Sequence, residues 1–248
     1  MSIEFENEII KEFEELDTRN FRVNLSQHHL FLCGGNVDAK SKIPPSFRDR
    51  LLTYTADNED DIHNSFVLAE SFKDYFKENR YTDLLAFEED IASLSTLIII
   101  LLESPGSLVE LGMFCNKPEF YKKLLIVAPQ EHIQSEDSFI YLGPLEYIRK
   151  KDNSSVAIYP WPDSLVSEYD EENINDLCEN IKQKLKLIPK TETFNPEKSG
   201  HIALLIYELI RLSYPILIGE IEIALLVRIP LHVEHPFRFN LNTDSDSR

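Results

Sequence analysis

The segment LIIILLESPGSLVELGMF, residues 97–114, decides the fold. Its first six residues are apolar without alternation, which is typical of a strand buried on both faces of a sheet. A Pro-Gly turn follows, and apolar residues then recur at helical spacing from Leu108 to Phe114. A buried strand that runs through a tight turn into a helix indicates one strand–helix unit of an α/β fold.

Other parts of the chain repeat this unit. Short apolar runs predict buried strands at 30–33, 124–128 and 156–159, and helical periodicity is found at 47–52, 83–95 and 174–185. Strands without alternation that are separated by helices form a parallel sheet. We therefore predict an α/β fold, a flavodoxin-like or Rossmann-like parallel sheet with helices on both faces. Ligands of such sheets bind beyond the carboxyl ends of the strands, where both glycine-containing loops fall.

The C-terminal part of the chain is predicted to be separate. Residues 189–200, PKTETFNPEKSG, are polar and contain proline and glycine, so they predict a linker between domains at 1–188 and 201–248. The second domain shows helical spacing at 202–212 and 216–227 and then strict alternation at 231–241, which indicates a small, abbreviated winged-helix-like segment. An amphipathic helix is predicted at 3–16.

The charge of the chain excludes several classes of partner. The 248 residues carry 43 Asp and Glu against 25 Lys and Arg, a net charge of −18. Nucleic acids and anionic membranes repel such a chain, so we predict that any link to nucleic acid runs through a partner. Three cysteines without a C-x-x-C pair, an acidic N-terminus and the lack of a long apolar run predict a cytoplasmic protein without a membrane span.

Clusters that suggest metal ligands have ordinary explanations. The acidic stretch 57–61 lacks the Gly and the distal Glu of a calcium loop, and we interpret it as a solvated loop. His232 and His235 fall on the predicted alternating strand, where they need not converge, so no metal site is predicted. The basic runs at 149–151 and 182–186 are interpreted as solvated faces, with contact to a partner as the alternative.

Glu110 is the candidate catalytic residue. It lies in the first turn of the predicted helix after the Pro-Gly turn, and Ser107 is expected to cap that helix and leave backbone N–H groups pointing at the site. A carboxylate at this place faces the anomeric carbon of a bound ribosyl group. There it stabilises or captures the oxocarbenium-like state of N-glycosidic cleavage. The alternative is that Glu110 only stabilises the helix N-terminus electrostatically.

The motifs ESPGSLVELG (103–112) and FLCGG (31–35) resemble the nucleoside 2-deoxyribosyltransferase-like superfamily. More closely, they resemble the effector proteins encoded beside bacterial retron reverse transcriptases. Those effectors have a Cys-Gly-Gly loop, an Arg in the next helix, a Glu in a Leu-rich helix, ESPGS-x-x-ELG, and Ser-Phe-x-x-x-Gly-Pro. This chain supplies them in the same order as Cys33–Gly35, Arg48, Glu88, Glu103–Gly112, and Ser138-Phe139 with Gly143-Pro144.

This resemblance implies a role for each matching residue. Glu110 would be the catalytic carboxylate, and Glu103 would help to hold the sugar hydroxyls. The ribose and phosphate pocket would be lined by the backbone of Gly34, Gly35, Ser104, Pro105, Gly106 and Ser107. Arg48 would contact phosphate and Glu88 would orient a hydroxyl or a neighbouring side chain. The alternatives are a surface ion pair for Arg48 and a solvated helix face for Glu88. Cys33 is interpreted as a small apolar residue that ends a strand.

The function implied by the resemblance is that of an N-glycosidase, the toxic effector of a retron-type antiphage system. It would hydrolyse NAD to nicotinamide and ADP-ribose, with NAD as substrate and without a cofactor. Its inhibitor would be the reverse transcriptase with its RNA–DNA product, and a homo-oligomer is expected. The alternatives are a nucleoside or nucleotide 2-deoxyribosyltransferase or hydrolase, and a non-catalytic sensor of a nucleotide such as ADP-ribose.

Thr96 departs from the pattern of the superfamily. Deoxyribosyltransferases and many relatives carry an Asp just before the central strand, where it assists proton transfer on the departing base, whereas this chain has Thr96. The change is expected to weaken base exchange. Hydrolysis of NAD tolerates it better, because nicotinamide leaves with its positive charge neutralised by the bond cleavage and needs no general acid.

Overall fold

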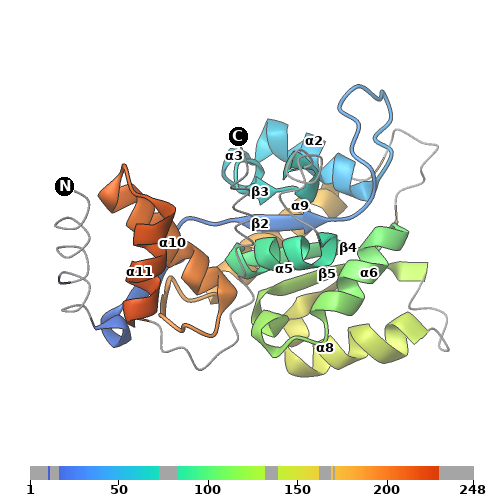
Figure 1. Ribbon diagram of the computed structural model, residues 1–248. Helices are drawn as coiled ribbons and strands as arrows, with labels where there is room; N and C mark the ends of the chain where they lie inside the picture. The colour runs from blue at the N-terminus through green and yellow to red at the C-terminus, as the bar shows by residue number, and fades with distance from the viewer. Residues whose placement is uncertain are drawn as a thin grey trace, which may run out of the picture. The chain divides into compact units, whose positions relative to one another are not determined.

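The computed structural model describes residues 11, 17–72, 83–131, 139–161, 169 and 171–228. Contacts divide the chain into two units, Arg22–Glu192 and a second that joins Met1–Phe21 with Thr193–Arg248. The larger unit contains the central sheet and the predicted site (Figure 1). None of the helices in the described part of the chain is long and apolar enough to cross a membrane.

A five-stranded parallel sheet lies at the centre of the larger unit. Its strands, in spatial order, are β3 (Phe66–Val67), β2 (Leu30–Cys33), β4 (Leu97–Leu101), β5 (Leu124–Pro129) and β6 (Val156–Tyr159). Numbered along the chain, this order is 2-1-3-4-5, the flavodoxin-like order, in which the direction of winding reverses between the first and third strands. The predicted fold class is confirmed. Only β3, with two residues, was too short to predict.

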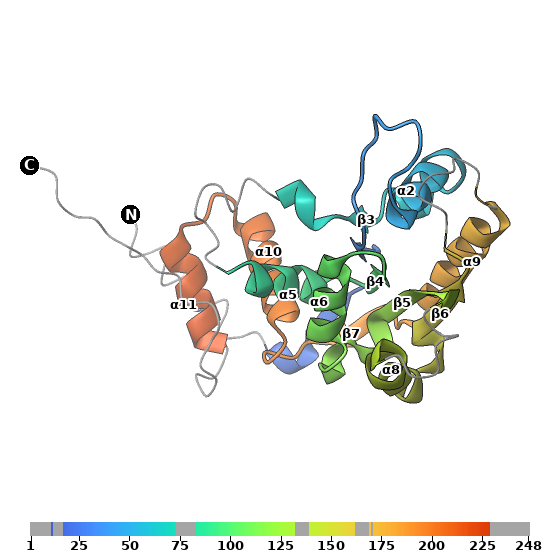
Figure 2. The same ribbon diagram turned by 90° about the vertical axis from the view of Figure 1, so that its right-hand side faces the viewer.

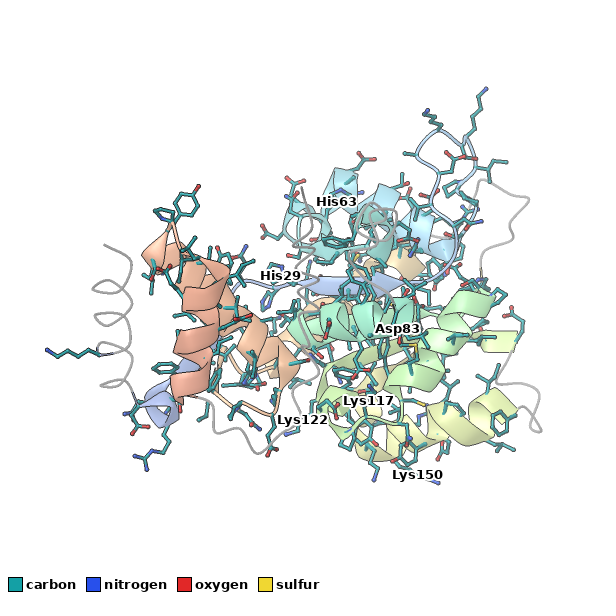
Figure 3. All side chains as sticks on the ribbon, in the orientation of Figure 1. His29, His63, Asp83, Lys117, Lys122 and Lys150 are labelled. Atoms are coloured by element: carbon teal, nitrogen blue, oxygen red, sulfur yellow. The ribbon has the colours of Figure 1, made fainter. Side chains whose placement is uncertain are left out.

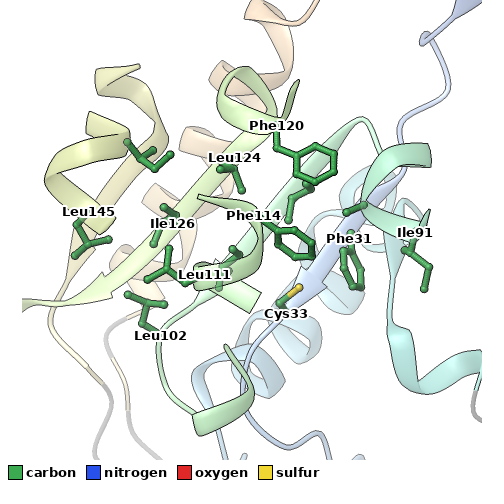
Figure 4. Packing of buried hydrophobic residues seen from close by; sticks show 14 of the residues in the cluster. Phe31, Cys33, Ile91, Leu102, Leu111, Phe114, Phe120, Leu124, Ile126 and Leu145 are labelled. Atoms are coloured by element: carbon green, nitrogen blue, oxygen red, sulfur yellow. The ribbon is translucent and has the colours of Figure 1, made fainter. Parts of the chain in front are cut away.

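Helices cover both faces of this sheet. One face packs against α2 (Phe47–Asn58), α3 (Asp60–His63) and α9 (Glu171–Leu187), and the other against α5 (Leu84–Leu94), α6 (Pro105–Phe114) and α8 (Glu146–Lys151) (Figure 2). The connections contain η2 (Ala69–Phe72), η3 (Pro118–Lys123), η4 (Tyr141–Leu145) and η5 (Asn153–Ser155). Alternate strand residues face opposite clusters, so Leu32 packs with α2 whereas Cys33 packs beside α6 (Figure 4).

The acidic stretch 57–61 is helical except at Glu59, which corrects the prediction of a loop. Helix α2 ends at Asn58 and α3 begins at Asp60, because Glu59 between them has non-helical dihedral angles, φ −142° and ψ 63°. The N–H groups of Glu59 and Ile62 still donate to the carbonyl oxygens of Thr55 and Glu59 across this junction. Within the described ranges, no group of three or more His, Cys, Asp or Glu residues lies close enough together to hold a metal ion.

The smaller unit contains η1 (Thr18–Asn20), α10 (Ser199–Ser213) and α11 (Ile218–Arg228). The two C-terminal helices are therefore confirmed. The predicted linker 189–200 holds the start of α10 and β7 (Thr191–Thr193), which pairs with β1 (Arg22–Asn24). The predicted strand at 231–241, with its two histidines, and all but Lys11 of the predicted helix at 3–16 lie outside the described residues. The winged-helix-like assignment stays a prediction.

Lys184 does not belong to a solvated basic face. Its side chain is 2% exposed, and its Nζ donates to Asp152 Oδ2 at 2.8 Å and to the hydroxyls of Ser154 and Ser155 at 2.9 and 2.8 Å. This contact joins α9 to the turn before β6. The run at 149–151 differs, since the Lys150 side chain is 72% exposed on α8 (Figure 3).

Replacing Lys184 by Met is expected to lower the free energy of unfolding by about 2 kcal/mol, because it leaves the partly exposed carboxylate of Asp152 and the buried hydroxyl of Ser155 without their cation. Lys186→Met is the matched control, since Lys186 is exposed on the same helix, and its effect is expected to stay below about 0.5 kcal/mol. Urea denaturation of both variants measures the difference. Equal stabilities would show that the pair of Lys184 and Asp152 does not anchor α9.

Candidate functional site

Two loops meet where the winding of the sheet reverses. Gly34 and Gly35 follow β2, and Glu103 and Ser104 follow β4, which pairs with β2 in parallel register. The Ser104 hydroxyl donates to the carbonyl oxygen of Gly34 at 3.0 Å. The predicted convergence of the two loops at the carboxyl ends of the strands is therefore confirmed.

Glu103 fastens these loops to helix α2. Its Oε1 accepts the backbone N–H groups of Gly35 at 2.8 Å and of Arg48 at 3.0 Å, and its Oε2 accepts that of Phe47 at 2.6 Å. The carboxylate thus lies at the N-terminus of α2, where the unpaired N–H groups and the helix dipole attract an anion. Glu103 takes the place that a bound phosphate takes at many helix N-termini.

The two glycines allow this close approach. A Cβ on Gly34 would lie 2.9 Å from Glu103 Oε1, and a Cβ on Gly35 would lie 2.7 Å from the Cβ of Ser46. Both distances are shorter than real side chains tolerate. Gly106 differs, since its nearest contact would be the Ser104 hydroxyl at 3.6 Å. The C-G-G sequence is thus explained by packing against Glu103 and α2.

Helix α6 begins earlier than the sequence indicated. It starts at Pro105, and its N-cap is Ser104, whose hydroxyl accepts the N–H of Ser107 at 3.0 Å. The Ser107 hydroxyl in return accepts the N–H of Ser104 at 3.1 Å, which completes a capping box. The prediction that Ser107 is the cap is therefore wrong. Glu110 lies in the second turn of the helix, not the first, while Pro105 and Gly106 are exposed at its start.

Glu110 is a partly buried glutamate with one unsatisfied carboxylate oxygen. Its Oε2 is buried and lacks a hydrogen-bond partner among the described residues. Burial and the nearby carboxylate of Glu88 raise the pKa of Glu110 to about 7, against the opposing effects of a hydrogen bond with Cys33 and the charge of Arg48. At neutral pH this group is poised between its charged and neutral forms.

Glu88 and Cys33 complete the surroundings of Glu110. Glu88, on α5, is partly buried, and burial together with the charge of Glu70 raises its pKa. Cys33 is fully buried at the end of β2, and burial followed by the charges of Glu110 and Glu88 raises the pKa of its thiol well above the ordinary value. The thiol therefore keeps its proton, so Cys33 is an apolar strand residue, as predicted, that also contacts the carboxylate.

Arg48 is buried, so the alternative of a surface ion pair is wrong. Its residue is 4% exposed, its Nη1 donates to the carbonyl of Leu32 at 3.3 Å, and its Nη2 pairs with Glu70 Oε1 at 2.5 Å. Its Nε is buried and unpartnered within the described residues. Glu70, on η2, was not found from the sequence, because a lone Glu in a short turn carries no pattern.

Thr96 lies at the opposite edge of the sheet. It precedes β4, and its hydroxyl accepts the N–H of His29 at 3.2 Å. The five residues of β4 place about 16 Å between Thr96 and the loop that contains Glu103. A residue at this position cannot act on a base bound beside Glu110. The inference that Thr96 weakens base exchange is therefore wrong. Ser138 lies outside the described residues, and Gly143 and Pro144 fall in η4.

Comparison with known proteins assigns the family. The family model of the STM3845 retron effector protein matches residues 44–240, well over half of the chain. The chain belongs to this family. The matched range of the retron effector includes α2, β4 and α6, and thus Arg48, Glu103 and Glu110.

Two Escherichia coli proteins are similar to the effector. The Retron Ec86 putative ribosyltransferase/DNA-binding protein is 30% identical over 165 residues, which cover 65% of this chain and 48% of that protein. The corresponding Retron Ec73 protein is 37% identical over 129 residues, which cover 51% of this chain and 39% of that protein. The effector therefore spans less than half the length of these relatives.

Replacing Glu103 by Gln is expected to destabilise the effector by about 2–3 kcal/mol, since one oxygen becomes an NH₂ group that faces N–H donors. For a chain of this size the melting temperature falls by about 5–10 °C. The control is Glu89→Gln, which removes only the partly exposed ion pair with Lys117 and is worth at most about 1 kcal/mol. Thermal melts that coincide for the two variants would contradict the anchoring role of Glu103.

Proposed function

We propose that this retron effector is an N-glycosidase of an antiphage defence system that hydrolyses NAD to nicotinamide and ADP-ribose. The observation that carries the proposal is the position of Glu110 at the switch point of the sheet, a partly buried carboxylate whose buried Oε2 lacks a hydrogen-bond partner among the described residues. Ligands of this fold bind at that place. Family membership and the ribosyltransferase names of the two relatives support a reaction at a ribosyl group.

The reaction breaks the bond between C1′ of the ribose and the pyridinium nitrogen of nicotinamide. Its electron pair leaves with nicotinamide, which becomes neutral, and C1′ acquires oxocarbenium character. The ionised Glu110 stabilises this positive charge across the ring, in a site where burial strengthens the interaction. Water then adds to C1′ and loses one proton, so the products are nicotinamide, ADP-ribose and a proton.

The charges around Glu110 suit a substrate whose base is positively charged before the bond is cleaved. Glu110, Glu88 and Glu70 lie close enough for their charges to affect one another, and Arg48 is the cation that acts on Glu110. Such a site favours the positively charged nicotinamide ring of NAD over a neutral base. The diphosphate is assigned to the exposed first turn of α6 at Pro105 and Gly106, whose dipole favours anions.

The roles of the remaining residues follow from their contacts. Glu103, Gly34 and Gly35 position the site, since the Glu103 carboxylate already accepts three backbone N–H groups. Ser104 and Ser107 hold the start of α6. Arg48 acts beside the reacting sugar, because its guanidinium is buried and fixed by Leu32 and Glu70.

Control of the activity is assigned to a partner. A glycosidase that consumes NAD must be held inactive until infection, and we propose the reverse transcriptase with its RNA–DNA product as the inhibitor. The net charge of −18 favours contact with nucleic acid through that transcriptase rather than through this chain. A homo-oligomer and a cytoplasmic location belong to the same proposal.

Purified effector is expected to release nicotinamide from NAD, and Glu110→Gln is expected to lower the rate by about 100-fold or more, because the variant lacks the charge that stabilises the transition state. Chromatography of the released nicotinamide measures this loss. Glu89→Gln, next to Glu88 on α5, serves as the control and should retain the activity of the native chain, because the Glu89 carboxylate pairs with Lys117.

Two outcomes would contradict the proposal, and each would indicate a different function. Cleavage of deoxynucleosides or deoxynucleotides but not of NAD would indicate a 2-deoxyribosyltransferase or hydrolase, an alternative that the position of Thr96 leaves intact. An increase in melting temperature with ADP-ribose, without turnover of any of these substrates, would indicate a nucleotide sensor.

A further inference from the structure

The central sheet ends in an edge strand without the usual protection against pairing. β6 pairs in parallel with β5, and no other strand of the described residues pairs with it (Figure 2). Its sequence, VAIY, contains no charged residue, proline or glycine. Native proteins protect exposed edges with such residues or with very short strands, as β3 with its two residues protects the other edge. The edge of β6 is therefore a candidate for pairing with another chain.

A groove follows this edge. A cavity of about 290 Å³ lies between β6 and α9, with the four residues of the strand along one wall. The other wall includes Asp176, Asn180, Gln183 and Leu187 of α9. The Leu187 side chain is a large apolar group that is 70% exposed. A strand that is added to the edge of β6 would place its side chains on this side of the sheet in the groove.

Helix α9 runs antiparallel to β6 in fixed alignment. Asp176, in the first half of the helix, accepts a hydrogen bond from the Tyr159 hydroxyl at 2.8 Å, at the carboxyl end of the strand. Lys184, in the second half, donates to Ser154 and Ser155 just before the amino end of the strand. Asn180 is therefore level with the middle of β6. The 17 residues of α9 extend this surface to about 25 Å, well beyond the length of the strand.

The charges along α9 match those of a second, antiparallel α9. Glu171, Glu172 and Asp176 are exposed in its first half, whereas Lys186 and Lys190 are exposed at and beyond its C-terminal end. An antiparallel copy brings the acidic half of each helix toward the basic end of the other. The net charge of −18 repels two copies over most of their surface, so this charge-balanced region favours a second copy of the chain.

We infer that two copies of the effector associate through antiparallel pairing of their β6 strands, with the two α9 helices side by side. A two-fold axis perpendicular to the sheet through the middle of β6 keeps both helices on one face and joins the two sheets into one. Such an isologous contact closes on itself and forms a dimer. The inference specifies the homo-oligomer of the proposed function, but it is drawn from β6 and α9 and does not depend on the reaction.

The strand contact is tested with Ile158→Lys. Sedimentation velocity of the native effector over a concentration series is expected to show a particle of twice the chain mass of 28.8 kDa. Lysine on an edge strand opposes pairing, because its charged group would have to enter the contact. The variant is expected to sediment as a monomer at the concentrations where the native chain is dimeric. A thermal melt establishes that it folds.

The helix contact is tested with two opposite changes at Gln183. Because Asn180 is level with the axis, Gln183 of one copy is level with Asp176 of the other. Gln183→Glu is expected to raise the dimer dissociation constant about 5-fold and Gln183→Lys to lower it about 5-fold, since each change acts twice across the axis. The matched controls are Gln27→Glu and Gln27→Lys, because Gln27 is exposed before β2, with two strands between β2 and β6. Both should leave the constant unchanged.

The outcomes separate this inference from the proposed function. A native effector that stays monomeric, or an assembly that a folded Ile158→Lys protein retains, overturns the inference. Shifts in opposite directions at Gln183 support it even where Ile158→Lys does not fold, and the absence of opposite shifts overturns it. Nicotinamide release is measured in parallel. Hydrolysis of NAD by a monomer overturns only this inference, whereas a dimer with the expected shifts that leaves NAD intact contradicts only the proposed function.

Discussion

The acceptance of three backbone N–H groups by the Glu103 carboxylate is the interaction on which the rest of the site depends. It connects the end of β4 with the loop after β2 and with the first turn of α2, three segments that are distant in sequence. Hydrogen bonds to a charged acceptor are stronger than neutral ones, and here they also satisfy the N-terminus of a helix. The anion that holds the switch point together is thus part of the chain itself.

This arrangement positions Arg48 and Glu110, two of the described residues that carry a buried polar atom without a hydrogen-bond partner. The position of Arg48 is fixed because its own backbone N–H donates to Glu103 at the N-terminus of α2. The position of Glu110 is fixed by helix α6, whose N-terminus is capped by Ser104 and Ser107. Burial of Glu110 beside Glu88 disfavours its charged form, which costs folding stability at neutral pH. A site that keeps such a group is organised for a ligand rather than for stability, a common compromise at functional sites.

Much of the fold was readable from the sequence because its strands are buried on both faces and therefore uniformly apolar. Strands β2 and β6 were predicted with the bounds that the structure gives, whereas β3, with two residues, carries no pattern. The site was less readable. Its motif located Glu103 and Glu110, but only three-dimensional contacts reveal that Glu103 is occupied by backbone amides and that Glu70 pairs with Arg48. The expectation for Thr96 failed because a residue just before a parallel strand lies at the amino end of that strand, whereas ligands of this fold bind at the carboxyl ends.

Titration of Glu110 tests most directly whether this partly buried carboxylate changes its charge near neutral pH. The carboxyl carbon resonances of ¹³C-glutamate-labelled protein, followed by NMR from pH 4 to 9, identify Glu110 as the signal that the Glu110→Gln variant lacks. The account predicts a midpoint of about 7, well above the ordinary value of a glutamate. A midpoint at that ordinary value would contradict the account, because Glu110 would then be a solvated carboxylate without the burial on which the proposed chemistry depends.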